Sequence, residues 1–279
     1  MRTLVHLSDL HFGRVDPELL DPLRELVHRI APTVVVVSGD LTQRAKSEQF
    51  EEARAWLDTL PGPQIIVPGN HDISLYNVFR RFVLPLDRYK RHITEDLDPV
   101  YIDDEVAVLG VNTARSLTWK DGRVNKEQVE KIRATLASLP PEVVRVVVTH
   151  HPFDLPDGCT EEDDLVDRAQ MAMDVFAECG VDLLMAGHLH KSHAGNTQAR
   201  YKISEYAALV VQAGTATSTR GRGEVNSFNV IRTEPQKIEV DRYGWDEIHK
   251  QFQLLQSEKF MRSGNVWAEV NEGLYAAGI

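Results

Sequence analysis

Five short apolar runs, each followed at once by polar side chains able to bind metal, constrain this chain more than any other feature. The clearest run covers residues 65–67, whose β-branched side chains are typical of a buried strand. A Pro-Gly pair then stops the strand and allows a tight turn, and Asn70, His71 and Asp72 follow. One strand end of this kind is a weak signal. Its repetition five times predicts a shared site.

The four other runs are built in the same way. The polar groups that follow them are Asp9 and His11, Asp40, His150 and His151, and His188 and His190. Helical periodicity between the runs makes strands alternate with helices, which predicts a largely parallel sheet. Ligands of such sheets collect beyond the carboxyl ends of the strands, so we expect the five groups to lie close together.

The donor atoms in these groups are carboxylate oxygens, an amide oxygen and imidazole nitrogens, with no thiolate. That set suits Mn, Fe or Zn and argues against an iron–sulfur cluster or a structural zinc site. In Asp9-x-His11 and His188-x-His190, side chains two residues apart can point to one side of an extended segment and reach a common ion. Seven or eight ligands are too many for one tetrahedral ion and suit two ions that share a carboxylate.

The formal net charge of −11 argues against binding to nucleic acid or to an anionic membrane surface, because both require Lys/Arg surfaces. Metal ions can still supply the positive charge that an anionic substrate needs. The two cysteines, Cys159 and Cys179, make no disulfide framework, which indicates a reducing compartment. No signal-peptide pattern or membrane-length apolar run occurs, so we expect an entire, cytoplasmic chain; a homo-oligomer is left open.

The chain shows no internal repeat and no convincing linker, so a single domain over residues 1–279 is expected, with a motif core at 1–243 and a C-terminal extension at 244–279. Ile73–Ile93 is expected to be helical with a break near Pro85. Three later runs are expected as strands of a more antiparallel layer, namely 207–212, 227–233 and 237–242.

The last patterned stretch, Trp245–Phe260, is expected to form an amphipathic helix. Three other stretches are candidates for a lid or a specificity wall, namely 76–89, 115–123 and 153–164.

The order Asp-x-His, Gly-Asp, Gly-Asn-His-Asp, His, Gly-His-x-His resembles that of the calcineurin-like metallophosphoesterase superfamily, from Asp9 to His190. Within that superfamily, residues 38–42 and 112–115 resemble the bacterial class III cyclic-nucleotide phosphodiesterase and glycerophosphodiesterase group. The resemblance implies an α/β fold in which two mixed β-sheets form an αββα sandwich flanked by helices. It also implies an enzyme, a metal-dependent phosphoric ester hydrolase.

The resemblance implies two divalent ions (Mn, Fe, Zn or a mixture) that share a bridging hydroxide, which attacks the phosphorus of a small phosphoester. One ion would be held by Asp9, His11 and His190, with Asp40 bridging to a second ion held by Asn70, His150 and His188. His71 would be the acid that serves the leaving group. Asp72 would fix the tautomer of His71 by accepting a hydrogen bond from its other ring nitrogen.

The candidate substrate contacts are Arg44, Arg115 and His151, with Arg220 and Arg222 as weaker ones. For the arginines the alternative is a solvated surface role. The expected reaction is hydrolysis of small phosphodiesters, including 3′,5′-cyclic nucleotides. A broad-specificity phosphomonoesterase and a lipid or nucleotide pyrophosphatase remain alternatives. A DNA-repair nuclease is disfavoured by the acidic charge, and a non-catalytic scaffold by the intact set of ligands.

Overall fold

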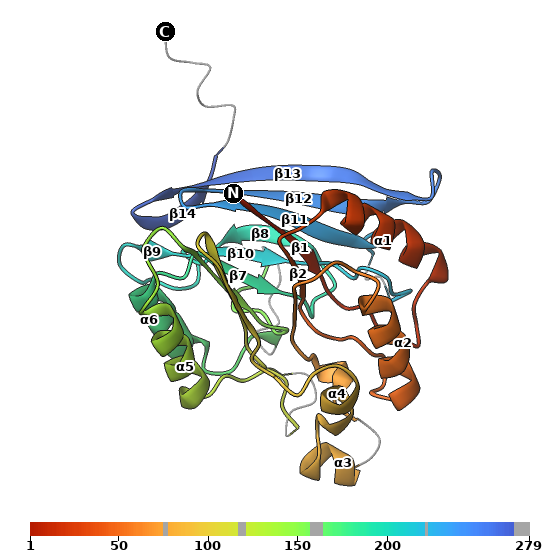
Figure 1. Cartoon of the computed structure of the whole chain (residues 1–279). Coiled ribbons are helices and arrows are strands. Elements are labelled where there is room, and N and C mark those ends of the chain that lie inside the picture. Colours follow the sequence, from red (N-terminus) through yellow and green to blue (C-terminus); the bar gives the residue numbers. More distant parts are fainter. Residues whose placement is uncertain (75–77, 117–120, 157–163, 221–222, 271–279) are drawn as a thin grey trace.

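The computed structural model describes residues 1–74, 78–116, 121–156, 164–220 and 223–270 (Figure 1). Cys159, Arg222 and parts of all three stretches proposed as a lid lie outside these residues. Two β-sheets pack face to face between two pairs of helices, one pair on each outer side (Figure 1). The predicted αββα sandwich is therefore confirmed, whereas the single-domain organisation stays a prediction.

The first sheet has eight strands, and its parallel part holds the first three apolar runs of the sequence. Its order is β3 (Gln64–Ile66), β2 (Val34–Val37), β1 (Arg2–Leu7), β11 (Ser227–Glu234), β12 (Lys237–Asp246), β13 (Gln251–Ser263), β14 (Asn265–Glu269) and β9 (Tyr206–Ala207). Strands β3, β2 and β1 are parallel, and β1, β11, β12, β13 and β14 pair antiparallel in succession. The polar groups after β1, β2 and β3 therefore leave the sheet at the same edge.

The second sheet has six strands and holds the other two apolar runs. Its order is β4 (Val100–Ile102), β5 (Val106–Gly110), β6 (Val144–Val148), β7 (Leu183–Ala186), β10 (Leu209–Gln212) and β8 (His193–Asn196). Strands β5, β6, β7 and β10 are parallel. The expected antiparallel pairing is correct for β11 and β12. Residues 207–212 mostly form β10, which pairs antiparallel with β8 but parallel with β7, so the expectation holds for only one of its two neighbours.

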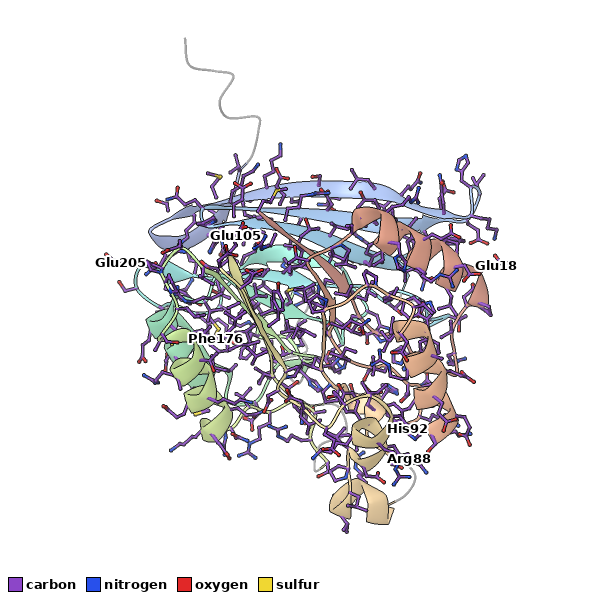
Figure 2. All side chains as sticks on the ribbon, in the orientation of Figure 1. Glu18, Arg88, His92, Glu105, Phe176 and Glu205 are labelled. Carbon is purple, nitrogen blue, oxygen red and sulfur yellow. The ribbon has the colours of Figure 1, made fainter. Side chains whose placement is uncertain are left out.

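Three apolar cores hold the layers together, and side chains fill the space between them (Figure 2). Helices α1 (Pro17–Ile30) and α2 (Ser47–Leu57) cover the first sheet, whereas α5 (Lys126–Leu136) and α6 (Ala169–Cys179) cover the second. The third core lies between the sheets and consists mainly of Val, Ile and Leu from the buried strands. Among the described residues, the side-chain clusters that could hold a metal ion lie at the strand ends and not among these apolar side chains.

Helices α1 and α5 begin at residues whose side chains cap them. Asp16 accepts from the amide of Glu18 at the start of α1, and Asn125 accepts from that of Gln128 at the start of α5. The expected helical stretch with a break is present as α3 (Val78–Val83) and α4 (Asp87–His92). Within the described part of the chain, no helix combines the length and the hydropathy needed to cross a membrane.

The helix expected over Trp245–Phe260 is wrong, because these residues form the end of β12, a turn and most of β13. Trp245, Ile248, Phe252 and Leu255 are spaced by three or four residues, which imitates a helical stripe. In the structure Trp245 and Phe252 are buried, whereas Ile248 lies in the turn and is 87% exposed. A β-bulge opposite Arg242 and Tyr243 shifts the register of β13, so its two-residue alternation is interrupted.

Candidate metal centre

The proposed ligands lie in tight turns directly after their strands. Five of them have left-handed backbone angles, with φ of 53° at Asp9, 51° at His11, 52° at Asp40, 72° at His188 and 56° at His190. Non-glycine residues rarely adopt this conformation, and such outliers cluster at functional sites. Neighbouring glycines allow the close packing: a Cβ at Gly187 would lie 1.8 Å from Ser8 Oγ, and one at Gly69 would lie 2.1 Å from Asp40 Oδ1.

Asp9, His11 and His190 bring three donor atoms together in a buried cluster. Asp9 Oδ1 lies 3.1 Å from His190 Nε2 and 3.6 Å from His11 Nε2, and the two imidazole nitrogens are 3.2 Å apart. Asp9 Oδ1 is fully buried and forms no hydrogen bond with the described residues. A buried carboxylate oxygen beside two imidazole nitrogens fits a divalent cation in chemistry and in spacing.

The protonation of this cluster also fits a metal. Burial lowers the pKa of His11 to about 3, so its ring is neutral at pH 7. Burial alone would raise the pKa of Asp9, but the adjacent His190 outweighs it and holds the pKa well below its usual value. Neutral His11 and ionised Asp9 are thus in the forms that bind metal, whereas Asp9 raises the pKa of His190, so metal binding there would displace a proton.

The second cluster forms around Asn70, which follows β3 in a short 3₁₀ turn (Asn70–Asp72). Asn70 Oδ1 lies 3.0 Å from His150 Nε2 and 3.1 Å from His188 Nδ1, and these two nitrogens are 3.3 Å apart. An amide oxygen and two imidazole nitrogens again converge on one point. His151 lies close enough to His150 and His188 to count as a further donor of this cluster.

Asp40 faces both clusters. Its Oδ1 lies 3.4 Å from His150 Nε2 and its Oδ2 lies 3.8 Å from His11 Nε2. The side chain is buried at the carboxyl end of β2, between the ligands that follow β1 and those that follow β3. One carboxylate with an oxygen on each side is the arrangement needed to link two ions.

Groups outside the clusters orient the imidazole ligands. His150 Nδ1 lies 2.8 Å from the Ser38 carbonyl oxygen, so it donates there and leaves Nε2 for a metal. His190 Nδ1 lies 3.3 Å from the carbonyl oxygen of Arg220. His188 Nε2 faces Asp164 Oδ1 at 3.5 Å, and His188 Nδ1 faces the cluster. The ring nitrogen that points inward is thereby fixed for each of these three residues.

The structure contradicts the expected contact between Asp72 and the His71 ring. Asp72 accepts from the backbone amides of Gly69, Leu41 and Thr42 at 2.9–3.1 Å, so it clamps the turn after β2 to the turn after β3. Burial, together with the nearby Asp40, raises the pKa of Asp72 to about 7. The sequence could not distinguish this role, because an Asp after a Gly-Asn-His turn can reach either the ring or the amides.

His71 is oriented instead by Gln43, whose carbonyl oxygen lies 2.9 Å from His71 Nδ1. On the other side of the ring, Arg220 Nη1 lies 3.0 Å from His71 Nε2. The ring also lies edge-on to His11, with centroids 5.0 Å apart, so it borders the first cluster. Sequence reasoning missed Gln43, because a backbone carbonyl carries no residue signature, and gave Arg220 little weight within a Gly/Arg-rich loop.

The three candidate substrate contacts have different surroundings. Arg44 is exposed and lines a cleft beside Gln43. The Arg115 guanidinium donates to the carbonyl oxygens of Asn112 and Ala114 and to the Gln128 side chain, so these bonds hold its own loop. His151 is buried against His150 and His188, and its Nδ1 lies 2.8 Å from Thr113 Oγ1.

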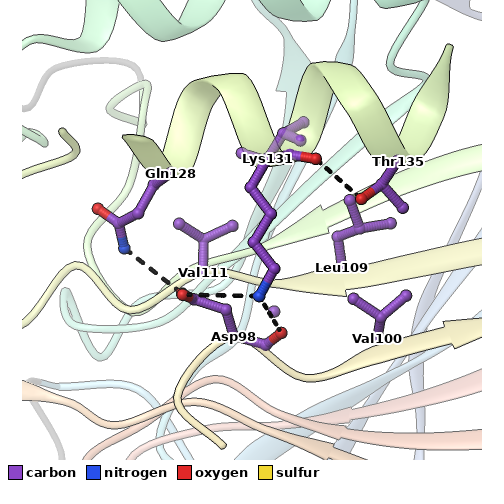
Figure 3. Close-up of a pocket in the computed structure, with 9 residues that line it drawn as sticks. Asp98, Val100, Leu109, Val111, Gln128, Lys131 and Thr135 are labelled. Carbon is purple, nitrogen blue, oxygen red and sulfur yellow. Dashed lines mark hydrogen bonds and ion pairs between the residues drawn. The ribbon is translucent and has the colours of Figure 1, made fainter. Parts of the chain in front are cut away.

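A small cavity lies beneath α5 and is lined in part by the start of the loop after β5 (Figure 3). It is too small to be a substrate site. Its free volume of about 10 Å³ leaves room for one water molecule at most. Asp98 at its mouth accepts from the Asn112 amide, and Gln128 donates to the Asn112 carbonyl oxygen. The adjacent Thr113 contacts His151, so the network holds the loop after β5 in place beside the second cluster.

A sequence profile of the calcineurin-like phosphoesterase family matches residues 2–192. The match covers more than half of the chain and spans all seven proposed metal ligands. The chain therefore belongs to the calcineurin-like phosphoesterase family, and it is a metal-dependent phosphoric ester hydrolase.

Individual relatives are distant. The 3′,5′-cyclic adenosine monophosphate phosphodiesterase CpdA of Haemophilus influenzae is 20% identical over 228 residues, which cover 81% of this chain and 76% of that protein. The glycerophosphodiester phosphodiesterase GpdQ of Enterobacter lignolyticus is 35% identical over 82 residues, only 25% of this chain and 29% of that protein. Purple acid phosphatase PPD1 of yellow lupin shares the fold, with a TM-score of 0.70 at 14% identity over 92% of this chain and 53% of that chain.

Proposed function

We propose that this chain hydrolyses small phosphodiesters, 3′,5′-cyclic nucleotides among them, at a two-metal centre. The observation that carries the proposal is the position of Asp40, whose two oxygens face two separate groups of donor atoms. One group consists of Asp9, His11 and His190, and the other of Asn70, His150 and His188, with His151 as a further candidate.

When bound, two divalent ions generate a nucleophile from water near neutral pH and neutralise charge on the phosphate oxygens. Manganese, iron and zinc all suit the oxygen and nitrogen donors, since the geometry of this site does not select among them. The chain's own residues have three tasks: they hold the ligands in place, serve the leaving group and bind the ester.

His71 is positioned to serve the leaving group. Its Nδ1 donates to the Gln43 carbonyl oxygen, so Nε2 faces away from Gln43. Arg220 Nη1 lies 3.0 Å from Nε2. When an ester is bound, the Arg220 guanidinium can pair with a phosphate oxygen and leave His71 Nε2 to act on the departing oxygen. This assigns charge stabilisation to Arg220, and donation of a proton to the departing oxygen to a His71 ring that is protonated at Nε2 as well as at Nδ1.

The preference for diesters is supported by the relatives named above, a cyclic-nucleotide phosphodiesterase and a glycerophosphodiester phosphodiesterase. The acidic net charge of −11 speaks against a polynucleotide substrate. The low cysteine content favours the cytoplasm as the place of action. No partner other than a small phosphoester is needed.

A substrate panel tests the proposal. The full chain, loaded with Mn, is assayed on 3′,5′-cyclic AMP, glycerophosphodiesters, a bis-aryl phosphate diester, the matching aryl monoester and single-stranded DNA. We expect the small diesters to have the highest kcat/KM and chelation to abolish their hydrolysis. A higher kcat/KM for the monoester or for DNA would replace the diester assignment with a phosphomonoesterase or a nuclease.

A further inference from the structure

Residues 214–220, which follow β10 of the second sheet, form a strap across the turn that follows β1 of the first sheet. That turn, residues 8–11, carries two of the proposed ligands of the first cluster. Threonine occurs at alternate positions of the strap, namely 215, 217 and 219. The proposed chemistry uses only Arg220 of the strap and gives the threonines no task.

The hydroxyls of Thr215 and Thr217 donate to backbone carbonyl oxygens of the turn. Thr215 Oγ1 lies 2.8 Å from the Asp9 carbonyl oxygen. Thr217 Oγ1 lies 2.9 Å from the carbonyl oxygen of Leu10. All four residues are buried, with 2% or less of their surface exposed. Bulk water cannot replace these donors, so removal of either hydroxyl would leave a buried carbonyl group without its partner, which costs free energy.

The backbone of the turn is unusual and depends on such support. Asp9 and His11 have φ angles of 53° and 51°, in the left-handed region that non-glycine residues rarely adopt. Their amides donate to the carbonyl oxygens of Gly39 and Asp40 at 3.1 and 2.9 Å. The turn after β2 thus holds the amides of this segment, and the strap holds its carbonyl groups. A strained conformation of this kind persists only where the surroundings fix it from several sides.

The strap also contacts the third ligand of the first cluster. His190 Nδ1 lies 3.3 Å from the carbonyl oxygen of Arg220, and this contact leaves Nε2 for the cluster. The strap is therefore bonded to both segments that supply histidines to this cluster. Within the described part of the chain, no hydrogen bond joins the strap to Asn70, His150 or His188 of the second cluster.

We propose that Thr215 and Thr217 are positioning residues that set the affinity of the first cluster for its metal ion. Their hydroxyls hold the turn in the conformation that brings the Asp9 and His11 side chains to His190. The inference rests on the proposed function, because it needs a metal ion at the first cluster. It deepens that function by separating the two metal sites, since one depends on the strap and the other does not.

Thr215→Val and Thr217→Val test the proposal, since valine keeps the branched shape of the side chain and removes the hydroxyl. We expect each variant to lower the affinity of the first cluster for Mn by about tenfold, the lower end of the effects of groups that hold metal ligands. Thr215→Ser and Thr217→Ser should keep most of the affinity, because serine keeps the donor. The measured quantity is the Kd for Mn, obtained by competition with a chelator at fixed pH.

Two background variants show which cluster is affected. His150→Ala removes a ligand of the second cluster, and His11→Ala removes a ligand of the first. The valine variants should raise the Kd in the His150→Ala background, where the first cluster is intact. They should leave the Kd unchanged in the His11→Ala background. A general loss of folding would weaken both clusters alike, so the selective effect separates positioning from a purely structural role.

Thr233→Val is the matched control. Thr233 pairs with Arg2 at the opposite end of β1, is 2% exposed and donates its hydroxyl to the Arg2 carbonyl oxygen at 3.5 Å. The control therefore removes a buried hydroxyl that bonds to the same strand without altering the turn, and the Kd should stay unchanged in both backgrounds. Urea denaturation in the presence of a chelator shows whether each variant is folded under the conditions of the titration.

Asn226→Ala is the milder variant that decides the matter where a valine variant does not fold. The side-chain amide of Asn226 donates to the carbonyl oxygen of Ser218 at 2.9 Å, so its removal loosens the strap without unpairing the turn. We expect the Kd of the first cluster to rise about threefold, as suits the loss of one neutral hydrogen bond.

Two kinds of result would overturn the proposal, and a third is distinguishable from them. If the Kd of the first cluster is the same in the folded threonine variants, in Asn226→Ala and in the control, the role of the strap is wrong and the proposed function stands. Equal rises of the Kd in both backgrounds would likewise reject positioning in favour of a structural role. If the unaltered protein binds no Mn at all, the proposed metal centre fails, and the role of the strap fails with it.

Discussion

The turns after β1, β2 and β7 and the hairpin of β12 and β13 lie in the same molecule but differ in backbone and in burial. The turns hold five non-glycine residues at left-handed angles and bury carboxylates beside imidazoles. The hairpin is long and extended, with Phe252 and Phe260 packed inward and Leu254 and Leu255 about half exposed. The turns therefore place donor atoms, whereas the hairpin covers a core.

This difference has an energetic side. Each non-glycine residue at a left-handed angle costs on the order of 1 kcal/mol or more, and buried charges add to that cost unless they are paired. The hairpin has no such residue except Lys250 in its turn, with a φ of 50°. We expect substitutions in the turns to change activity strongly, and substitutions that loosen the hairpin to change stability alone.

The largest effect is expected from Asp40→Ala. Removing the carboxylate that faces both clusters should lower kcat at least about a thousandfold and release both metal ions. Elemental analysis of the purified protein, together with kcat on a small diester, measures both effects. Asp241→Asn in β12, far along the chain from every ligand, is the control that should keep its metal. A metal-loaded, active Asp40→Ala variant would refute the bridging role.

His71→Ala should keep both metals and lose about a hundredfold or more in kcat on an alkyl ester. The loss should be much smaller on a nitrophenyl ester, because a good leaving group does not need a proton. The two substrates are compared under identical metal loading. Equal losses on both would mean that His71 does not serve the leaving group.

Asp182 tests the expectation that loosening the hairpin changes stability alone, because its hydrogen bonds connect β13 and β14 to the second sheet. Its Oδ1 accepts from Arg262 Nη1 at 2.9 Å and from Trp267 Nε1 at 3.1 Å, and its Oδ2 accepts from the Arg145 amide at 2.9 Å. Asp182→Ala leaves these donors unpaired and should lower the free energy of unfolding by about 2–4 kcal/mol. Urea denaturation measures this loss.

Metal content and kcat of folded Asp182→Ala should stay at their original values. Asp182→Asn, which keeps an acceptor oxygen, should lose less stability than the alanine variant. A large fall in kcat in the folded alanine variant would show that hairpin and turns are coupled.

Arg220→Gln should lower kcat/KM about tenfold on alkyl and nitrophenyl esters alike, because a contact to the phosphate does not depend on the leaving group. That equal loss would separate Arg220 from His71, whose removal discriminates between the two esters. Arg220→Lys should recover part of the activity. A loss confined to the alkyl ester would instead make Arg220 act only through His71.

The effect that is smallest near neutral pH concerns acid stability. Burial lowers the pKa of His6 to about 3 from 6.5, so between these pH values the unfolded chain binds one more proton than the folded chain. Stability is therefore lost as the pH falls from 6.5 toward 3, by about 1.4 kcal/mol per pH unit from this group. His6→Gln should reduce the slope by that amount in urea titrations with a chelator present.

His249 in the hairpin turn has a side chain that is 65% exposed, so His249→Gln is the matched control. An equal change of slope in both variants would show that burial of His6 is not the cause.

The sequence predicted the parallel strand ends well because β-branched runs such as residues 34–37 have no other plausible place than a buried sheet. Parallel pairing alone predicted that Asp9 and Asp40 converge, whereas His188 follows a strand of the second sheet and reaches them because the two sheets pack face to face. The left-handed angles at these residues were not predictable, because they are imposed by packing against neighbouring turns.

The failures have physical reasons as well. In Trp245–Phe260 a turn and a bulge gave strand residues a helical spacing, and no local signal distinguishes the two. Asp72 and Arg220 were misjudged because their partners, the Gly69 amide and His71 Nε2, depend on chain folding between distant segments.

The place of β1 in its sheet has a consequence for synthesis of the protein. β1 lies between β2 and β11, so one of its edges finds its partner only when residues 227–234 have been made. A fragment ending at residue 192 would contain every proposed metal ligand and still leave that edge bare. Bare edges invite aggregation, so the catalytic residues of this chain depend on a late strand that contributes no ligand to them.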